Sequence, residues 1–128
     1  MRGRGVTGAL ALVVLAGCSD VGAQDAAAAA QAFVRASPAE ACGLLAPDTA
    51  KSVARSAGTG CAQRLAALDL PTATDVRRAE VAGESAQVQL ANQVVFLARF
   101  PDGWRVTAAG CVRDDPDPAV PYECEVEP

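Results

Sequence analysis

The order of apolar and polar residues divides the chain into an apolar start, a helical part and an alternating part. Residues 6–16 are almost entirely apolar. Between residues 25 and 68, apolar side chains recur every three or four positions, which is the spacing of amphipathic helices. After Pro71 the period changes to two, as in strands with one buried face. The pattern therefore predicts helices first and strands second.

Local signals set the expected bounds of the helices. Asp25 can cap an alanine-rich helix that runs to Arg35, because alanine has the highest helix propensity, although these alanines are also compatible with a low-complexity tether. Ser37-Pro38-Ala39-Glu40 combines a capping serine, a first-turn proline and a capping-box glutamate. The helices are expected over residues 25–35, 38–46, 48–57 and 61–68.

Turn residues separate the expected strands. Gly83-Glu84 and Asn92-Gln93 mark two turns, and Pro101-Asp102-Gly103 is a typical hairpin loop. The strands are expected over residues 75–82, 85–90, 94–100 and 104–112, with a short edge strand over 122–126. Short connections favour neighbouring antiparallel strands. The predicted fold is α+β, with the N-terminal helices packed on one face of a four- to five-stranded antiparallel meander.

The apolar start has the layout of a bacterial lipoprotein signal. Two arginines precede an apolar run of about eleven residues, too short for the roughly twenty of a transmembrane helix. Leu15-Ala16-Gly17-Cys18 then matches a lipobox. We expect residues 1–17 to be removed and Cys18 to carry a diacylglyceryl group. The alternative is an ordinary cleaved signal, with Cys18 a bystander and the product released.

This interpretation sets the expected domain organisation and location. Residues 18–24 would form a short tether, which spans at most about 20 Å, and residues 25–128 a single domain. The protein would be lipid-anchored in the cell membrane and face the extracytoplasmic side. Two acyl chains suffice for stable anchoring.

The cysteine count agrees with acylation at Cys18. Five cysteines leave one unpaired in an exported protein, whereas acylation of Cys18 leaves four that can pair completely. We expect Cys42 to pair with Cys61 between neighbouring helices, and Cys111 to pair with Cys124 between the fourth strand and the tail. This is one of three possible connectivities. The separations of 19, 50 and 13 residues lack the spacing of a zinc site.

Charge and composition exclude several classes of function. Two of the eleven basic residues precede Cys18, so the processed chain has nine against fifteen acidic residues, a formal charge of −6. An acidic domain is repelled by nucleic acid and by anionic lipid head groups. The chain has no histidine, which removes Ser-His and Cys-His nucleophile pairs and the commonest metal ligand. We expect no metal and no cofactor.

Several segments resemble a group of small, largely uncharacterised lipoproteins of high-GC Gram-positive bacteria. They are the lipobox, Cys-Gly-Leu-Leu-Ala-Pro at residues 42–47, Cys61, Gly-Trp-Arg-Val-Thr-Ala-Ala-Gly-Cys at residues 103–111, and Pro-Tyr-Glu-Cys at residues 121–124. The helices-then-meander order also resembles the nuclear-transport-factor-2-like, or cystatin-like, fold. That resemblance implies a curved sheet wrapped around a helix to form a cone. The fold hosts enzymes and binding modules alike, and no catalytic residues carry over.

Two aspartates are the candidates for acid/base chemistry. Asp69 and Asp75 flank the helix-to-sheet junction and could face the mouth of a cone, where burial would raise a carboxyl pKa. Solvated carboxylates beside Pro71 are the simpler interpretation. An enclosed cavity of at least about 300 Å³ that is lined by a buried carboxylate would favour an enzyme.

The tail carries the other candidates. Asp114, Asp115 and Asp117, with Glu123, could attract calcium, but the spacing lacks the glycine and glutamate of an EF-hand loop, and a solvated acidic loop is expected. Tyr122, the only tyrosine, is expected to pack the tail beside the second disulfide rather than orient a ligand. Trp104 is expected to be a core anchor rather than a binding-surface aromatic.

Two hypotheses on function follow from the sequence. The first is a lipid-anchored, extracytoplasmic, non-catalytic domain that binds a protein or a small apolar ligand. The alternative is a small nuclear-transport-factor-2-like enzyme that uses carboxylates on an apolar substrate. The missing histidine and the lack of an acid/base constellation favour the first.

Overall fold

The computed structural model of the protein describes residues 3, 5, 8, 19–56 and 58–128. The lipobox and Cys18 lie outside these residues, so the lipid attachment stays a prediction from the sequence. Within the described part of the chain, no helix combines the length and the apolar character needed to cross a bilayer.

Helices precede strands, in the predicted order. The helices are α1 (Ser19–Arg35), α2 (Pro38–Leu44), α3 (Pro47–Ser56) and α4 (Cys61–Leu68), and the strands are β1 (Val76–Ala82), β2 (Ser85–Leu90), β3 (Val94–Phe100) and β4 (Gly103–Cys111). The capping box predicted at the start of α2 is present, with Ser37 and Glu40 bonded reciprocally. The backbone N–H and the hydroxyl of Ser37 both donate to the Glu40 carboxylate and lower its pKa.

α1 begins six residues before the predicted cap. Because residues 19–24 are helical, the prediction of a tether over residues 18–24 is wrong for them, and Asp25 lies inside the helix. Packing on the sheet at Gly22 accounts for the extension. An ideal Cβ at Gly22 would lie 3.5 Å from Nη2 of Arg99 and 3.9 Å from Cγ2 of Val81. The first turns of α1 thus pack on the sheet, and such packing stabilises turns that intrinsic propensity alone does not.

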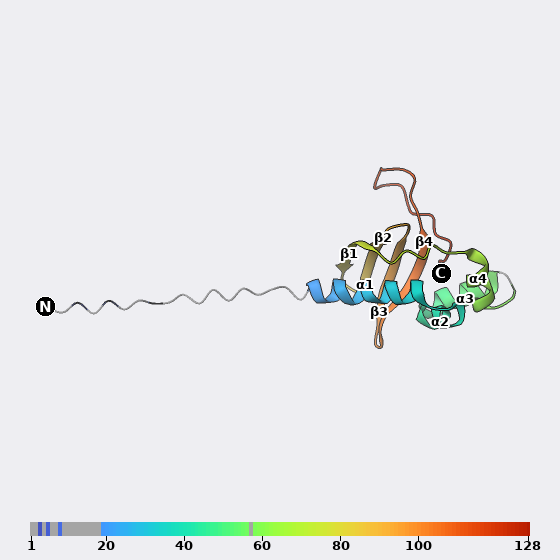
Figure 1. Ribbon diagram of the computed structural model, residues 1–128, viewed down its shortest axis with the longest axis horizontal. Coiled ribbons are helices and arrows are strands. Elements are labelled where there is room, and N and C mark those ends of the chain that lie inside the picture. Colours follow the sequence, from blue (N-terminus) through green and yellow to red (C-terminus); the bar gives the residue numbers. More distant parts are fainter. Residues whose placement is uncertain (1–2, 4, 6–7, 9–18, 57) are drawn as a thin grey trace.

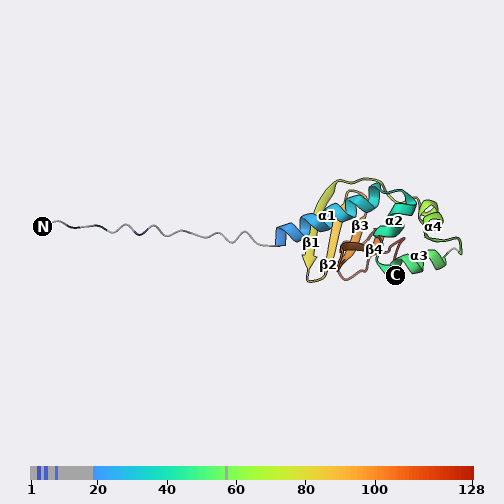
Figure 2. The same cartoon turned by 90° about the horizontal axis from the view of Figure 1, so that it is seen from below.

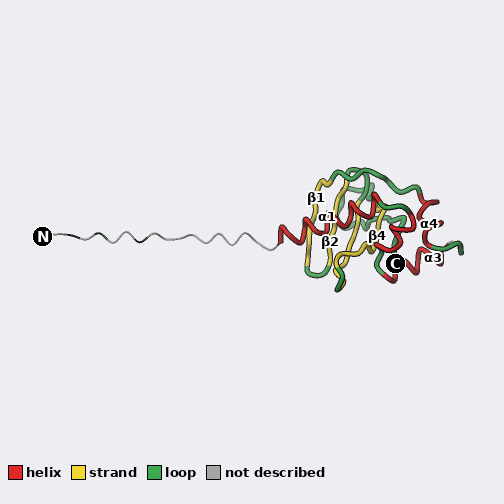
Figure 3. The backbone as a smooth tube through the Cα atoms, turned by 60° about the horizontal axis from the view of Figure 1, so that its bottom comes forward, coloured by secondary structure: helices red, strands yellow, loops and turns green. Residues whose placement is uncertain are grey.

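The strands form the predicted antiparallel meander, in the order β1-β2-β3-β4. α1 lies across all the strands on one face of the sheet, whereas α2, α3 and α4 gather beyond β4 (Figures 1 and 2). Figure 3 shows the same crossing of helix over strands by secondary structure. Ala86, Val88 and Leu90 of β2 are buried and alternate with more exposed residues, as predicted.

The core lies between α1 and the sheet, with α2, α3 and α4 closing one end. Its largest fully buried side chains are aliphatic, and small alanines let α1 approach the strands closely. The buried core residues are Ala26, Ala30, Phe33, Ala41, Leu45, Val53, Leu65, Ala86, Val88, Leu90, Val95, Leu97, Val106, Ala109 and Val126.

The fifth strand predicted over residues 122–126 does not form. The backbone of the tail pairs with β4 and the residue that follows it at two isolated bridges, Ala109 with Val126 and Val112 with Glu123. Between these bridges Gly110 has φ +64°. This positive φ takes the β4 backbone out of the extended conformation and interrupts the ladder that a fifth strand would need.

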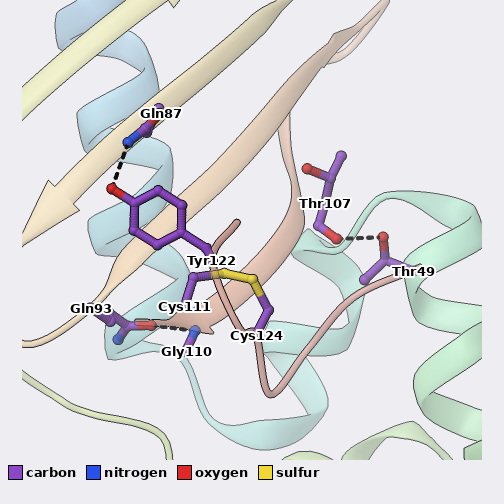
Figure 4. The surroundings of a disulfide bond; sticks show 8 residues. All are labelled: Thr49, Gln87, Gln93, Thr107, Gly110, Cys111, Tyr122 and Cys124. Carbon is purple, nitrogen blue, oxygen red and sulfur yellow. Dashed lines mark hydrogen bonds between the residues drawn. A yellow bond between two sulfur atoms is a disulfide. The ribbon is translucent and has the colours of Figure 1, made fainter. Parts of the chain in front are cut away.

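Residues far apart in sequence cover the outer edge of β4. The N–H of Ala46 donates to the carbonyl of Val106 at 2.7 Å. The hydroxyl of the buried Thr49 donates to the carbonyl of Thr107 at 2.9 Å (Figure 4). Together with the two tail bridges, these bonds leave β1 as the uncovered edge of the sheet in the described structure.

One arginine adds a further link between the β3–β4 hairpin and the helices. Nη1 of Arg105 donates to the carbonyl of Gly43 at 2.8 Å, near the C-terminus of α2. The same guanidinium donates to the carboxylate of Asp102 in the hairpin loop and lowers the pKa of that carboxyl. Sequence reasoning missed this role, since an arginine in a strand does not show which carbonyl it reaches.

Candidate binding site

Both predicted disulfides are present. Cys42–Cys61 joins α2 to α4 across a separation of 19 residues. Cys111–Cys124 joins the end of β4 to the tail across a separation of 13 residues. The predicted pairing is therefore confirmed, and the second bond holds the tail against the sheet face that α1 leaves uncovered (Figure 4).

Tyr122 packs the tail onto the sheet beside this second disulfide. Its ring meets the Phe96 ring edge-on, with centroids 5.5 Å apart. The Arg113 guanidinium carbon lies 4.6 Å from the centre of the Tyr122 ring, and Nε2 of Gln87 donates to the Tyr122 hydroxyl at 3.4 Å (Figure 4). The structure thus confirms the predicted packing role, and it adds an arginine stacked on the aromatic ring.

An open groove of about 580 Å³ lies between the β2–β3 turn and the tail. One wall is the turn, which contributes amide side chains and backbone. The other wall is the start of the acidic loop together with Tyr122. The lining residues are Gln89, Leu90, Ala91, Asn92, Gln93, Val94, Cys111, Val112, Arg113, Asp114, Asp115, Pro116 and Tyr122.

Gln93 fixes the floor of this groove. Gln93 is only 4% exposed, and both the nitrogen and the oxygen of its side-chain amide are hydrogen-bonded. Nε2 donates to the carbonyl of Pro71 at 2.9 Å, and Oε1 accepts from the N–H of Gly110 at 2.8 Å. A buried polar side chain with both partners satisfied rigidifies its surroundings. The turn, the segment after α4 and the end of β4 are thereby held in one arrangement.

The two candidate acid/base residues do not form a buried pair. Asp69 ends α4 in the left-handed conformation, with φ +50°, and lies at the rim of a cavity of about 190 Å³. Asp75 does not line that cavity, and both side chains are exposed. The cavity is largely apolar, with Phe33, Leu65 and Leu70 in its walls. No described residue supplies a buried carboxylate there, which is what the enzymatic hypothesis required.

The acidic loop bonds to its own backbone. The carboxylate of Asp115 accepts from the N–H of Asp117 at 2.8 Å, and that of Asp117 accepts from the N–H of Ala119 at 2.9 Å. Such local bonds are typical of turns. Among the residues that the structure describes, no group of histidine, cysteine, aspartate or glutamate side chains has the arrangement of a metal site. Asp114 and Asp115 instead give the groove a negative rim.

Trp104 contacts the core on one side and lines a surface hollow on the other. Part of its ring packs against the core, as predicted. The Arg99 guanidinium carbon lies 4.6 Å from the ring centre, and the remaining surface lines a hollow beside the first turns of α1. The strand pattern indicated the core contact. It gave no sign of the hollow, because α1 was expected to start later.

Comparison with protein-family models, with curated proteins and with solved structures finds no significant match for the chain.

Proposed function

We propose that the protein is a lipid-anchored, extracytoplasmic, non-catalytic binding domain whose groove beside the tail takes up a polar segment of a partner protein. The observation that carries the proposal is the groove itself, which is open, polar and of a size typical of binding sites. The anchor is supported by the lipobox at residues 15–18, and four cysteines in two disulfides suit an oxidising compartment.

The groove beside the tail and the cavity beside Asp69 favour a polypeptide over a small apolar ligand as the occupant. Small-molecule sites are usually enclosed and apolar, with volumes from about 300 Å³ upward. The apolar cavity beside Asp69 holds about 190 Å³. The groove holds about 580 Å³ but is open, and the amides of Gln89 and Asn92 and the carboxylates of the acidic loop are among the groups that line it. Such a surface matches the hydrogen-bonding needs of an extended chain.

The charge of the groove narrows the partner further. Asp114 and Asp115 lie on one wall, and the guanidinium of Arg113 is turned onto the Tyr122 ring. The processed chain would carry a formal charge of −6 by the count of its residues. A basic or amide-rich segment would be attracted to this rim, whereas an acidic one would be repelled.

At the level of fold, we propose the nuclear-transport-factor-2-like, or cystatin-like, arrangement. One long helix lying across an antiparallel meander supports this assignment (Figure 1). The proposal concerns shape alone, because this fold hosts many functions.

A carboxylate enzyme of the same fold class is the second candidate. Asp69 at the rim of an apolar cavity is the observation that favours it. The exposure of the Asp69 side chain counts against this candidate, because an exposed carboxylate lacks the water-excluding surroundings of a general acid in a closed active site.

Site-specific photo-crosslinking in intact membranes tests the binding proposal. A photoreactive residue replaces Asn92, which is exposed and lines the groove, and in a second strain it replaces Lys51 on α3 as a control. We expect a discrete protein adduct from position 92 and none of that mass from position 51. Asp114→Lys with Asp115→Lys should reduce this adduct at least about tenfold, since the rim then repels a basic segment.

A control variant with two charge reversals elsewhere on the surface separates the effect of charge at the groove from the effect of total charge. Glu84→Lys with Glu127→Lys changes the net charge equally at exposed positions outside the groove, and the adduct should persist. Identical adducts from positions 92 and 51, or no adduct from either, would count against a partner protein. Turnover of an apolar substrate that is lost in Asp69→Asn would support the enzyme instead.

A further inference from the structure

The hollow beside Trp104, of about 460 Å³, opens between the start of α1 and the β3–β4 hairpin. It lies at the end of the sheet opposite the β2–β3 turn, because neighbouring hairpins of a meander alternate between the two ends of the strands. The lining residues are Val21, Gly22, Asp25, Arg99, Gly103 and Trp104.

Three of the six lining residues, Val21, Arg99 and Trp104, have side chains that favour a membrane interface, and Asp25 is the one acidic residue beside them. Trp104 is the only tryptophan of the chain and is half-buried. The Arg99 guanidinium carbon stands 4.6 Å from the centre of its ring, and Val21 is 62% exposed. Tryptophan concentrates at the head-group level of bilayers, where the ring is half in apolar and half in polar surroundings. Arginine can bury its stem there while its charge meets phosphate.

The position of the hollow along the chain indicates which membrane it would meet. α1 begins at Ser19, directly after the predicted lipid-bearing Cys18. From Ser19 to Gly22 the helix rises only about 4.5 Å along its axis. Acyl chains attached to Cys18 therefore hold the first turn of α1, and with it this hollow, beside the head groups. A helix that is packed on the sheet leaves no flexible spacer in residues 19–24.

We propose that this hollow is a membrane-contact surface, in which Val21 and Trp104 enter the phospholipid head-group layer and Arg99 faces lipid phosphate. The inference rests on the proposed anchor at Cys18 and goes beyond it, because it gives the domain a fixed orientation. The hairpin end of the sheet faces the bilayer. The groove beside the tail lies at the opposite end and faces away from it, open to partners.

The single tryptophan makes the inference measurable on the full, processed chain. The acylated protein is reconstituted into phosphatidylcholine vesicles whose lipids carry bromine on the acyl chains, either close to the glycerol or near the methyl ends. We expect shallow bromine to reduce Trp104 emission roughly twofold and deep bromine to reduce it much less, as for an interfacial tryptophan. Val21→Glu should keep the protein on the vesicles and abolish most of this quenching.

Val76→Glu is the matched control. Val76 is an exposed valine at the first position of β1 and does not line the hollow. Quenching of Trp104 in this variant should equal that in the parent. Vesicle flotation separates the two proposals. A protein that floats but is unquenched, or equally quenched with and without Val21→Glu, overturns the membrane-contact surface and leaves the anchor standing. A chain that carries no acyl group and stays in solution overturns the anchor, and the inference fails with it.

Discussion

At the scale of single residues, the molecule depends on a few polar and conformational details inside an alanine-rich core. Gln93 joins the β2–β3 turn to Pro71 and to Gly110 through one buried amide. Gly110 has φ +64°, and an ideal Cβ there would lie 2.9 Å from Cδ2 of Leu70 and 3.0 Å from Cβ of Glu125. Neither the positive φ nor the contact tolerates a side chain.

Gly110→Ala should therefore destabilise the domain by about 1–3 kcal/mol, the cost of a non-glycine residue held in a disfavoured conformation. Urea unfolding of the disulfide-intact protein measures the change as a lower midpoint. Gly43→Ala is the control. Gly43 is helical, and its Cβ would meet nothing within 4 Å. That variant should be neutral or more stable by roughly 0.5–1 kcal/mol. Equal effects of the two substitutions would contradict the role of Gly110.

The sequence could not have predicted Gln93. A glutamine between two strands is typical of an exposed turn. The two backbone groups that hydrogen-bond to its amide, on Pro71 and Gly110, are distant in sequence. Tyr122 was predictable in part, because a lone tyrosine two residues before a disulfide has few other places to pack. Its stacking with Arg113 was not, since it depends on how the acidic loop folds back.

At the scale of elements, periodicity predicted which segments are helices or strands, and tertiary contacts decided where they end. The period of two found β2 and β4, a run that is apolar on both faces found β3, and capping residues found α2. α1 starts early because its first turns pack beside Arg99 and Val81 on the sheet. The tail fails to form a strand because Gly110 interrupts the ladder on β4. Local sequence patterns do not record such contacts.

The tail consequently depends on its disulfide. Removing the bond by Cys111→Ser with Cys124→Ser should cost about 3 kcal/mol on the chain-entropy model and should free the last dozen residues. A glutamate-specific protease then cuts quickly at Glu123 and Glu125, whereas the parent resists. Mass spectrometry of the products measures this. Cys42→Ser with Cys61→Ser loosens α2 from α4 instead, and the tail should stay protected. Unchanged protection in the first variant would show that the two bridges suffice.

At the scale of the whole molecule, the chain forms one helix layer on one antiparallel sheet, and two disulfides cross-link it. This α+β class and the cysteine pairing were both predictable. Cys42 and Cys61 were expected on neighbouring helices, and Cys124 was expected in a tail that returns to Cys111 at the end of the fourth strand. The cone-shaped fold and the location at the membrane stay predictions, because they depend on curvature and on residues before Ser19.

The location has a direct test. Cells grown with labelled palmitate should incorporate label into this protein, and Cys18→Ala should abolish it, because acylation requires the thiol of that residue. Fractionation should recover the parent with the membranes. An unlabelled parent that is released in mature form would indicate the ordinary cleaved signal instead.

The uncovered edge of the sheet gains significance if the protein is confined to a bilayer. Diffusion in two dimensions raises the frequency with which copies collide, and a smooth strand edge would invite neighbours to pair into larger sheets. β1 is not smooth: its register with β2 shifts at Arg77, and Arg78 and Glu80 project exposed charges beside that shift. This irregular, charged edge would disfavour edge-to-edge pairing between neighbouring copies of the domain.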